Sequence, residues 1–178
     1  MFKKVLLVVL ALAAILAIVI QLQPATFRVA RTASIVAPPE KVFAWINDFH
    51  NWDAWSPWTR LDPNLKATFS GPASGAGAVY AWSGNSNVGE GRMTIESADP
   101  GRHVGIRLEF IKPFASAAQT EFLLAPQAGA TRVTWSMSGD NNFLSKAMCL
   151  FTGGMDKIIG PDFEKGLAQL KRTVESRP

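Results

Sequence analysis

The chain opens with an uninterrupted run of apolar residues. Residues 5–20 contain no polar side chain, and Leu22 extends the run past Gln21. A helix rises about 1.5 Å per residue, so residues 5–22 reach roughly 27 Å, near the thickness of a thin hydrocarbon core. Lys3 and Lys4 precede the run, and the positive-inside rule keeps such charges on the cytoplasmic side. The pattern predicts a transmembrane anchor within residues 1–25.

A cleaved signal peptide is the main alternative for this segment, and a buried core helix is a weaker one. The apolar region of a signal peptide is usually only about 7–15 residues long and ends at a small-x-small cleavage site. Residues 21–26 (QLQPAT) contain no small pair well placed for cleavage. We therefore expect an uncleaved anchor, with one domain at residues 26–178 on the extracytoplasmic side. Both leading interpretations export that domain.

Beyond the anchor, the chain begins with a strand pattern and then a short helix. Residues 27–36 (FRVARTASIV) alternate between apolar and polar, as in a half-buried strand. Pro39 and Glu40 suit the first turn of a helix. Residues 41–48 place apolar side chains at helical spacing, which predicts a short helix with one buried face. A second short helical segment follows, and Pro57 ends it near Ser56.

Six further strands follow in close succession. Gly, Pro, Asn and Asp separate the apolar runs, as at residues 84–87 (GNSN) and 99–101 (DPG), which are turn signals. Alternation is clearest at residues 103–111, where Val104, Ile106, Leu108 and Phe110 share one face. Short strands joined by tight turns predict an antiparallel meander. The predicted strands are residues 66–69, 77–83, 89–97, 103–111, 117–124 and 131–137.

The C-terminal part of the chain is helical with one interruption. Residues 143–151 form a candidate helix that Gly153-Gly154 breaks. A second helix is predicted from Pro161 to about Glu175, because proline suits a first helical turn. Its apolar stripe needs a partner surface, and the sheet is the large one available. The stripe consists of Phe163, Leu167, Leu170 and Val174.

Composition and charge remove several classes of function. The formal net charge is +4, and no cluster of Lys and Arg with interleaved aromatics is present, so nucleic acid is not an expected partner. The one cysteine, Cys149, cannot form an internal disulfide. Six Trp and eleven Phe against one Tyr require many large rings to be buried, in a core or along a cavity.

This order of elements resembles the polyketide cyclase/dehydrase branch of the START-like superfamily, also called SRPBCC. The resemblance covers about residues 30–175. The resembling pieces are residues 37–43 (APPEKVF), 52–58 (WDAWSPW), 70–72 (SGP), 75–78 (GAGA), 82–85 (WSGN), 88–91 (VGEG), 131–135 (TRVTW) and 163–167 (FEKGL).

The resemblance implies an α+β helix-grip fold with a deep cavity. In that fold, a curved antiparallel sheet of about seven strands wraps around a long C-terminal helix, with two short helices after the first strand. Members of the family bind lipids, sterols, polyketides and other apolar molecules, and some are enzymes. Alternation and helical spacing nominate the side chains that line the pocket. They are Met93, Ile95, Ile106, Leu108, Phe110, Phe122, Trp135, Met137, Met155, Ile159 and Phe163.

The sequence offers few candidates for catalytic chemistry. Neither His50 nor His103 is spaced with a second metal ligand, so no metal site is expected. Glu90 and Arg92 share the strand face opposite the apolar one, which favours a surface ion pair. The glycine pairs at residues 75–77 and 89–91 lack the third glycine of a dinucleotide loop, so no cofactor is expected.

Three functions remain in competition. The first is an exported, tethered domain that binds a hydrophobic small molecule or lipid, with the membrane contacted through residues 5–22. The second is a cyclase, dehydratase or hydrolase, which would need a titratable group on the pocket side of the sheet. The third is a ligand-free interaction module of the cell envelope, which would show a filled core and an exposed apolar patch. The sparse polar inventory favours the non-catalytic binding protein.

Overall fold

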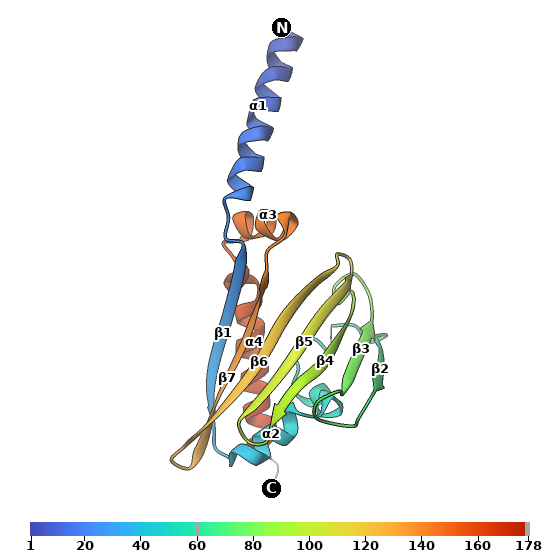
Figure 1. Ribbon diagram of the computed structural model, residues 1–178, viewed down its shortest axis with the longest axis vertical. Helices are drawn as coiled ribbons and strands as arrows, with labels where there is room; N and C mark the ends of the chain where they lie inside the picture. The colour runs from blue at the N-terminus through green and yellow to red at the C-terminus, as the bar shows by residue number, and fades with distance from the viewer. Residues whose placement is uncertain (60, 177–178) are drawn as a thin grey trace.

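The alternating segments pair into one curved antiparallel sheet in the computed structural model, which describes residues 1–59 and 61–176 (Figure 1). The order along the sheet is β1-β7-β6-β5-β4-β3-β2, so the predicted meander is confirmed and the first strand pairs with the last. The strands are β1 (Thr26–Ile35), β2 (Lys66–Ser70), β3 (Val79–Ser83), β4 (Glu90–Asp99), β5 (His103–Lys112), β6 (Ser116–Gln127) and β7 (Ala130–Asp140).

Irregularities in β4 contribute to the curvature of the sheet. The register between β4 and β5 shifts between Glu90 and Gly91 and again between Ile95 and Ser97. Such bulges increase the local twist and bend the strand. At Gly91 a Cβ atom would lie 2.5 Å from the Glu109 carbonyl oxygen and 2.6 Å from the Trp82 ring. Glycine at this position therefore allows the β5 backbone and the Trp82 ring to approach β4 closely.

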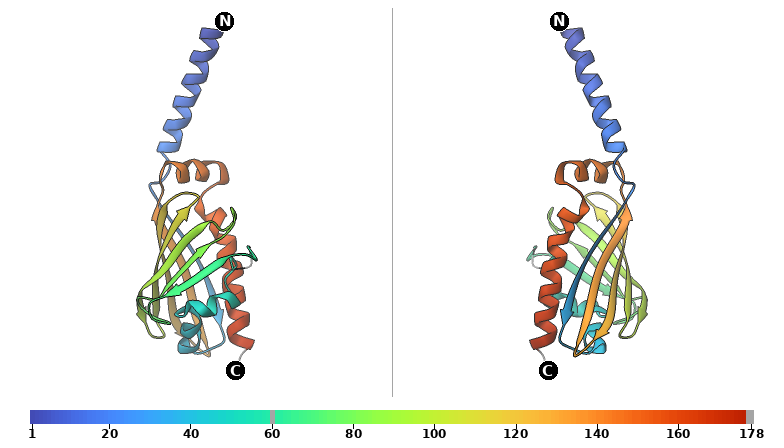
Figure 2. Two further views of the ribbon diagram at one scale, coloured as in Figure 1. Left: turned by 90° about the vertical axis from the view of Figure 1, so that its right-hand side faces the viewer. Right: turned by 90° about the vertical axis from the view of Figure 1, so that its left-hand side faces the viewer.

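The long helix α4 (Met155–Ser176) lies along the concave face of the sheet, nearest to β1 (Figure 2). Its predicted apolar stripe is buried against the sheet. The exposed fractions are 0% for Phe163, 2% for Leu167, and 0% for Leu170 and Val174. Side chains of this kind contribute about 1.5–3 kcal/mol each when fully buried. The sheet and α4 are therefore joined mainly by this stripe.

The predicted start of α4 at Pro161 is wrong. The helix begins at Met155, and Pro161 lies inside it. Proline has no N–H, so it removes one backbone hydrogen bond and weakens a helix interior. Arg31 on β1 bridges the two parts of the helix that lie before and after Pro161. Its guanidinium bonds Asp156 at 2.7 and 3.0 Å and Glu164 at 2.7 Å.

A glycine gives Arg31 the room to make these bonds. A Cβ atom at Gly160 would overlap the Arg31 guanidinium, so the arginine lies directly against the helix backbone. Hydrogen bonds to Asp156 and then Glu164 raise the pKa of Arg31, which stays charged. The cluster of Arg31, Asp156 and Glu164 is called the Arg31 clamp below. It fastens both sides of Pro161 to β1.

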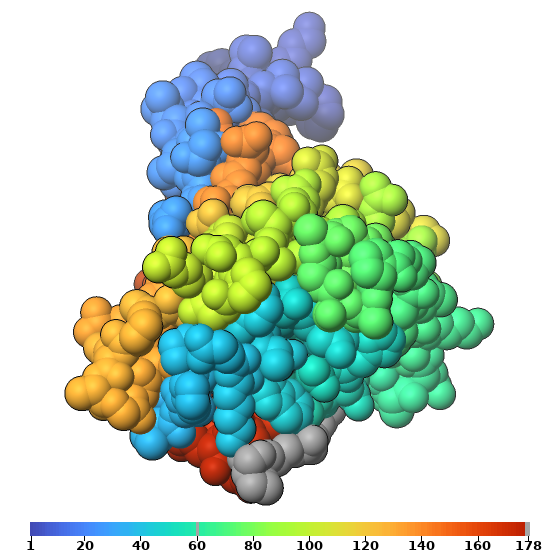
Figure 3. All heavy atoms as spheres, turned by 60° about the horizontal axis from the view of Figure 1, so that its bottom comes forward, coloured from blue at the N-terminus to red at the C-terminus, as the bar shows by residue number. Residues whose placement is uncertain are grey.

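Two short helices follow β1, as expected, and they cover the end of the sheet opposite the N-terminus (Figure 3). They are α2 (Pro39–Ile46) and the 3-10 helix η1 (Phe49–Ala54). Trp52 and Trp55 in this corner are buried, and their indole N–H groups donate to the carbonyls of Ile46 and Trp45 at 2.9 and 3.2 Å. The corner thus closes that end of the grip.

Two further helices lie at the other end of the domain (Figures 1 and 2). The helix α1 (Phe2–Gln21) projects away from the domain, and only 6% of its most apolar window is buried. Its length and composition are sufficient to cross a membrane. The helix α3 (Phe143–Thr152) lies crosswise to α1 beneath its base and ends at Gly153, whose φ of 84° suits glycine.

Candidate functional site

The concave side of the sheet is lined by alternate residues of its central strands. Alternation along each strand points their side chains to the concave side, where α4 and the short helices α2 and η1 lie. They include Met93 and Ile95 on β4, Ile106 and Leu108 on β5, Thr120 and Phe122 on β6, and Trp135 and Met137 on β7, with Met155, Ile159 and Phe163 from α4. The structure thus brings the sequence-predicted residues together on the two surfaces that face each other.

Aromatic rings fill the middle of the grip. Trp135 stacks on Phe163 with ring centroids 4.0 Å apart and an interplanar angle of 8°, and Phe122 stacks on Trp135 at 5.0 Å. Trp55 and Trp58 pack edge-on against Trp135, each at 5.7 Å. Phe122, Trp135 and Phe163 are at most 1% exposed. This part of the interior is packed core.

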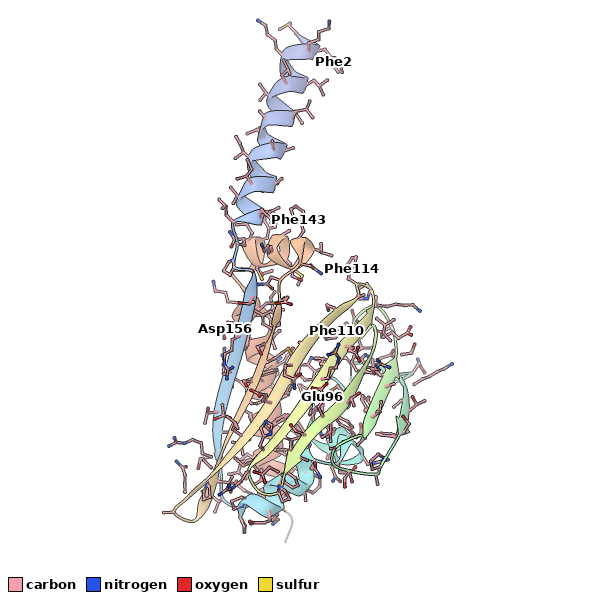
Figure 4. The ribbon with its side chains drawn as sticks, viewed as in Figure 1. Phe2, Glu96, Phe110, Phe114, Phe143 and Asp156 are labelled. Carbon is pink, nitrogen blue, oxygen red and sulfur yellow. The ribbon has the colours of Figure 1, made fainter. Side chains whose placement is uncertain are left out.

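A second group of the predicted residues is only partly covered. Met93, Met155 and Ile159 are half-buried and pack against the core, while Phe110 is 37% exposed. These four residues are called the apolar rim. Phe110 follows the inner-face alternation of β5, but it lies near the strand end, where little covers it (Figure 4). Phe110 is therefore the least buried of the residues nominated from the sheet.

Two buried polar atoms in this interior have no hydrogen-bond partner among the described residues. They are Oγ1 of Thr120, a residue 3% exposed, and Nε1 of Trp135, a residue 1% exposed. The indole N–H groups of Trp52 and Trp55 each donate to a backbone carbonyl, so the lack of a hydrogen-bond acceptor for the Trp135 indole among the described residues is unusual. An unsatisfied buried polar group costs about 1–3 kcal/mol. Sequence reasoning missed Thr120, although alternation places it on the same face as Phe122.

Tyr80 on β3 is a further polar group that sequence reasoning missed. Its ring lies 5.3 Å from Phe69 and stacks on Trp82 at 5.9 Å, all on the inner face of the sheet. Partial burial, and then the negative charge of Asp53, raise the pKa of the Tyr80 phenol. The hydroxyl therefore stays protonated at neutral pH and can donate a hydrogen bond.

The charged residues of β4 and β5 lie on the outer face, but their pairing differs from the prediction. Glu90 does not pair with Arg92. Arg92 Nε lies 2.7 Å from Glu109 Oε2, and Lys112 Nζ lies 2.7 Å from Glu90 Oε2. The hydrogen bond from Arg92 lowers the pKa of Glu109. Residues opposite each other on adjacent strands are closer than residues two apart on one strand, which explains the difference. Arg107 Nε also lies 3.5 Å from Glu109 Oε1.

Neither histidine lies in the interior. His50 Nδ1 bonds Asp48 Oδ1 at 2.7 Å, and its ring stacks on Phe69 at 4.1 Å. His103 lies on the outer face of β5, 3.9 Å from Glu121, as the alternation predicts. Within residues 1–59 and 61–176, no group of three His, Cys, Asp or Glu side chains could hold a metal ion.

Two surface hollows lie outside this interior. One of about 580 Å³ is on the outer face of the sheet, where Arg28 and Arg107 flank Gln119 and Ser138 in one cross-strand row. The other, of about 240 Å³, lies between η1 and β2. Both are open to solvent, so neither is the enclosed apolar cavity that the family resemblance implies.

The sheet wrapped on a C-terminal helix defines a helix-grip domain, and solved structures agree. The chain is similar to protein MLL2253 from Mesorhizobium loti, with 17% identity and a TM-score of 0.61, over 85% of this chain and 99% of that one. It is similar to a protein from Thermobifida fusca, with 16% identity and a TM-score of 0.62, over 83% and 92%.

A third similar structure is the di-domain ARO/CYC BexL from the BE-7585A biosynthetic pathway. The identity is 14% and the TM-score 0.63, over 90% of this chain and 53% of that one, so this chain spans about half of BexL. Identities this low show the fold alone. No curated protein matches the sequence. The profile of the family described as "Polyketide cyclase / dehydrase and lipid transport" matches residues 26–175. The chain belongs to this family.

Proposed function

We propose that this protein is a membrane-tethered domain that binds a hydrophobic small molecule or lipid inside the helix grip. The observation that carries the proposal is that two buried atoms, Thr120 Oγ1 and Trp135 Nε1, have no hydrogen-bond partner within residues 1–59 and 61–176. Buried polar groups are normally hydrogen-bonded, and an exception calls for an explanation such as a missing ligand or water. An apolar molecule that displaces part of this packing and places a polar head beside Thr120 and Trp135 would satisfy these atoms and cover the apolar rim.

The family supports the same proposal. Its description includes both polyketide cyclisation and lipid transport. Each of these activities requires an apolar molecule to be held in the domain. The half-buried state of Met93, Met155 and Ile159 also supports it, because these side chains have apolar surface left to cover.

The tether in this proposal is α1, retained rather than cleaved. Three hydrogen bonds attach the base of α1 and the following segment to the domain. Lys146 Nζ donates to the Gln21 carbonyl at 3.0 Å, and Asn141 donates to the carbonyls of Ala25 and Pro24 at 2.7 and 3.1 Å. Lys3 and Lys4 at the far end favour an extracytoplasmic location for the domain.

The test is native mass spectrometry of the full chain purified from the membranes of its own host, comparing wild type with Thr120→Val. Valine keeps the shape of threonine and removes only the hydroxyl. We expect wild type to carry a co-purified apolar molecule and Thr120→Val to retain several-fold less. Because the Thr120 hydroxyl has no hydrogen-bond partner among the described residues, none is lost, and the free energy of unfolding of the empty protein should stay equal or rise by up to about 1 kcal/mol.

The matched control is Thr134→Val on the outer face. The Thr134 hydroxyl bonds Thr32 Oγ1 at 3.1 Å, so its removal should cost about 0.5–1.5 kcal/mol and leave ligand retention unchanged. Reproducible absence of any bound molecule from folded wild-type protein would overturn the proposal. Equal ligand retention in both variants would remove Thr120 from the site.

Tyr80 supports a second candidate function, an enzyme that acts on the bound molecule. A protonated phenol on the inner face can donate a hydrogen bond to a carbonyl or enolate oxygen of a polyketide-like substrate. In that case, incubation would change the mass of the bound compound, and Tyr80→Phe would stop the change while leaving binding intact. Recovery of an unchanged compound from the wild-type protein would exclude the enzyme and support the carrier function.

A further inference from the structure

The helix α3 turns its apolar face outward. Phe143, Leu144, Met148 and Phe151 are 54%, 45%, 45% and 76% exposed. At 100° per residue these four positions fall on one side of the helix. The charged residue of α3, Lys146, is only 8% exposed. A surface helix of a soluble domain normally has the opposite arrangement, with its apolar side inward. A patch of large apolar side chains at one place on a surface indicates an interaction site.

The position of α3 indicates what covers this face. Both side views place α3 crosswise to α1 and directly beneath its base (Figure 2). The two helices contact each other, and Ile20 at the base of α1 is buried. Lys146 bonds the Gln21 carbonyl at the C-terminal end of α1. If α1 stands across a bilayer, α3 therefore lies along the surface of that bilayer.

The segment that connects α1 to the sheet fixes this arrangement. Only Leu22 to Ala25 separate α1 from β1, and Asn141 holds the backbone of Pro24 and Ala25 through two hydrogen bonds. Asn141 directly precedes the α3 N-cap, Asn142. These bonds hold the domain close to the base of α1, so a bilayer that α1 crosses would lie near α3. A second protein copy has no comparable connection to this face.

The hairpin between β5 and β6 provides a second contact at the same end. Its residues Ile111 and Phe114 are 49% and 61% exposed. Figure 4 places Phe114 at the hairpin tip and Phe143 on α3, both toward α1. Lys112 of the hairpin is paired with Glu90 at 2.7 Å, so the contact that the hairpin offers comes from its apolar side chains. Two separate apolar projections therefore point toward the plane from which α1 leaves.

We propose that α3 is an interfacial helix, with its exposed apolar face buried at the boundary of headgroups and acyl chains. The occupant of this face is the lipid bilayer, and the proposal rests on the proposed tethering by α1. Docking would bring the apolar rim close to the bilayer, because Met155 follows α3 within three residues and Phe110 adjoins the hairpin. A lipid ligand could then exchange with the membrane without crossing water.

Nitroxide scanning of the full chain in vesicles of phosphatidylethanolamine and phosphatidylglycerol tests this inference. In a Cys149→Ser background, single cysteines replace Phe151 on α3, Leu12 in α1 and Ala128 in the exposed β6–β7 turn. Collision with oxygen and with a water-soluble nickel chelate reports the depth of each label. We expect the oxygen preference at position 151 to be several-fold above that at 128 and below that at 12. Intrinsic tryptophan emission verifies folding.

The outcomes separate the two proposals. If the label at 151 behaves like the label at 128 while the label at 12 is deep, the tether stands and the interfacial helix is refuted. If the label at 12 is aqueous, the tether itself fails, and the inference fails with it. If the label at 151 is shielded from both reagents and shows spin–spin broadening, a second protein copy covers α3, which also overturns the inference.

Discussion

Gly166 allows α4 to lie against the ring of Trp135. A Cβ atom at this position would lie 2.7 Å from Cζ3 of Trp135 and 3.2 Å from Cδ of Pro57. Glycine inside a helix costs roughly 1 kcal/mol relative to alanine. Its presence here is explained by the stack of Trp135 on Phe163, three residues before it, which needs the backbone to come close.

Gly166→Ala should therefore destabilise the protein although alanine is the better helix former. Overpacking costs about 1–3 kcal/mol and exceeds the propensity gain of about 1 kcal/mol, so we expect a net loss on the order of 1 kcal/mol. Urea unfolding followed by tryptophan emission measures this. Ala168→Leu on the exposed side of α4 is the control, which adds more bulk at almost no cost. A more stable Gly166→Ala protein would contradict the packing explanation.

At the scale of residues, the sequence predicts which face of a strand or helix a side chain occupies, but it does not predict which side chains that residue contacts. Alternation with Val133 and Met137 places Trp135 correctly on the inner face, and the helical stripe places Phe163. That these two rings stack depends on the register of α4 against β7, which no local pattern contains. For the same reason, the sequence could not show that Trp135 Nε1 and Thr120 Oγ1 lack a hydrogen-bond partner in the described part of the chain.

At the scale of elements, α4 shows how a distant residue moves a helix boundary. Local rules favour a start at Pro161, since proline suits a first turn and is unfavourable further in. In the Arg31 clamp, the guanidinium of Arg31 binds Asp156 before the proline and Glu164 after it. Residues 155–160 thus stay helical through contacts with a strand more than a hundred residues away. Met155 and Ile159, half of the apolar rim, lie in this segment.

Arg31→Ala should loosen residues 155–160 and leave the rest of α4 in place. The buried stripe from Phe163 to Val174 does not depend on the arginine. Hydrogen exchange followed by mass spectrometry should show at least several-fold faster exchange in peptides covering 155–160 and little change in those covering 166–174.

Arg92→Ala serves as the control, because it breaks an ion pair on the outer face and should leave 155–160 unaffected. Equal protection of 155–160 in the wild type and Arg31→Ala proteins would show that the proline-containing turn is stable without the clamp.

Over the whole molecule, local signals account for most of the architecture and fail where distant segments meet. Turn residues predicted the meander of six strands, and hydropathy predicted α1 and α4. The pairing of β1 with β7 joins residues about a hundred positions apart. The crosswise position of α3 beneath α1 likewise depends on Lys146 and Asn141, whose bonds no periodicity indicates.

Carboxylates fasten the start of α4 to β1 and its end to Val36, the residue after β1, which makes the grip sensitive to acid. Asp156 bonds Arg31 at the start of the helix, and at its end Glu175 accepts from Lys171 Nζ at 2.7 Å and from the Val36 N–H at 2.6 Å. The hydrogen bond from Arg31 lowers the pKa of Asp156. The bonds from Lys171 and then Val36 lower the pKa of Glu175.

A carboxyl whose pKa is lowered in the folded state stabilises the folded protein at pH values above its unfolded pKa, which is about 4. This stabilisation is lost as the pH falls through the folded pKa. The urea midpoint of the full chain in detergent should therefore be nearly constant from pH 7 to 5 and fall below about pH 4. Tryptophan emission is suitable because all six tryptophans lie in the domain.

The double variant Asp156→Asn, Glu175→Gln should start from a lower urea midpoint, and its midpoint should fall less on acidification. A wild-type midpoint that rises on acidification, or an equal acid slope in the variant, would show that these carboxylates do not hold α4 to the sheet.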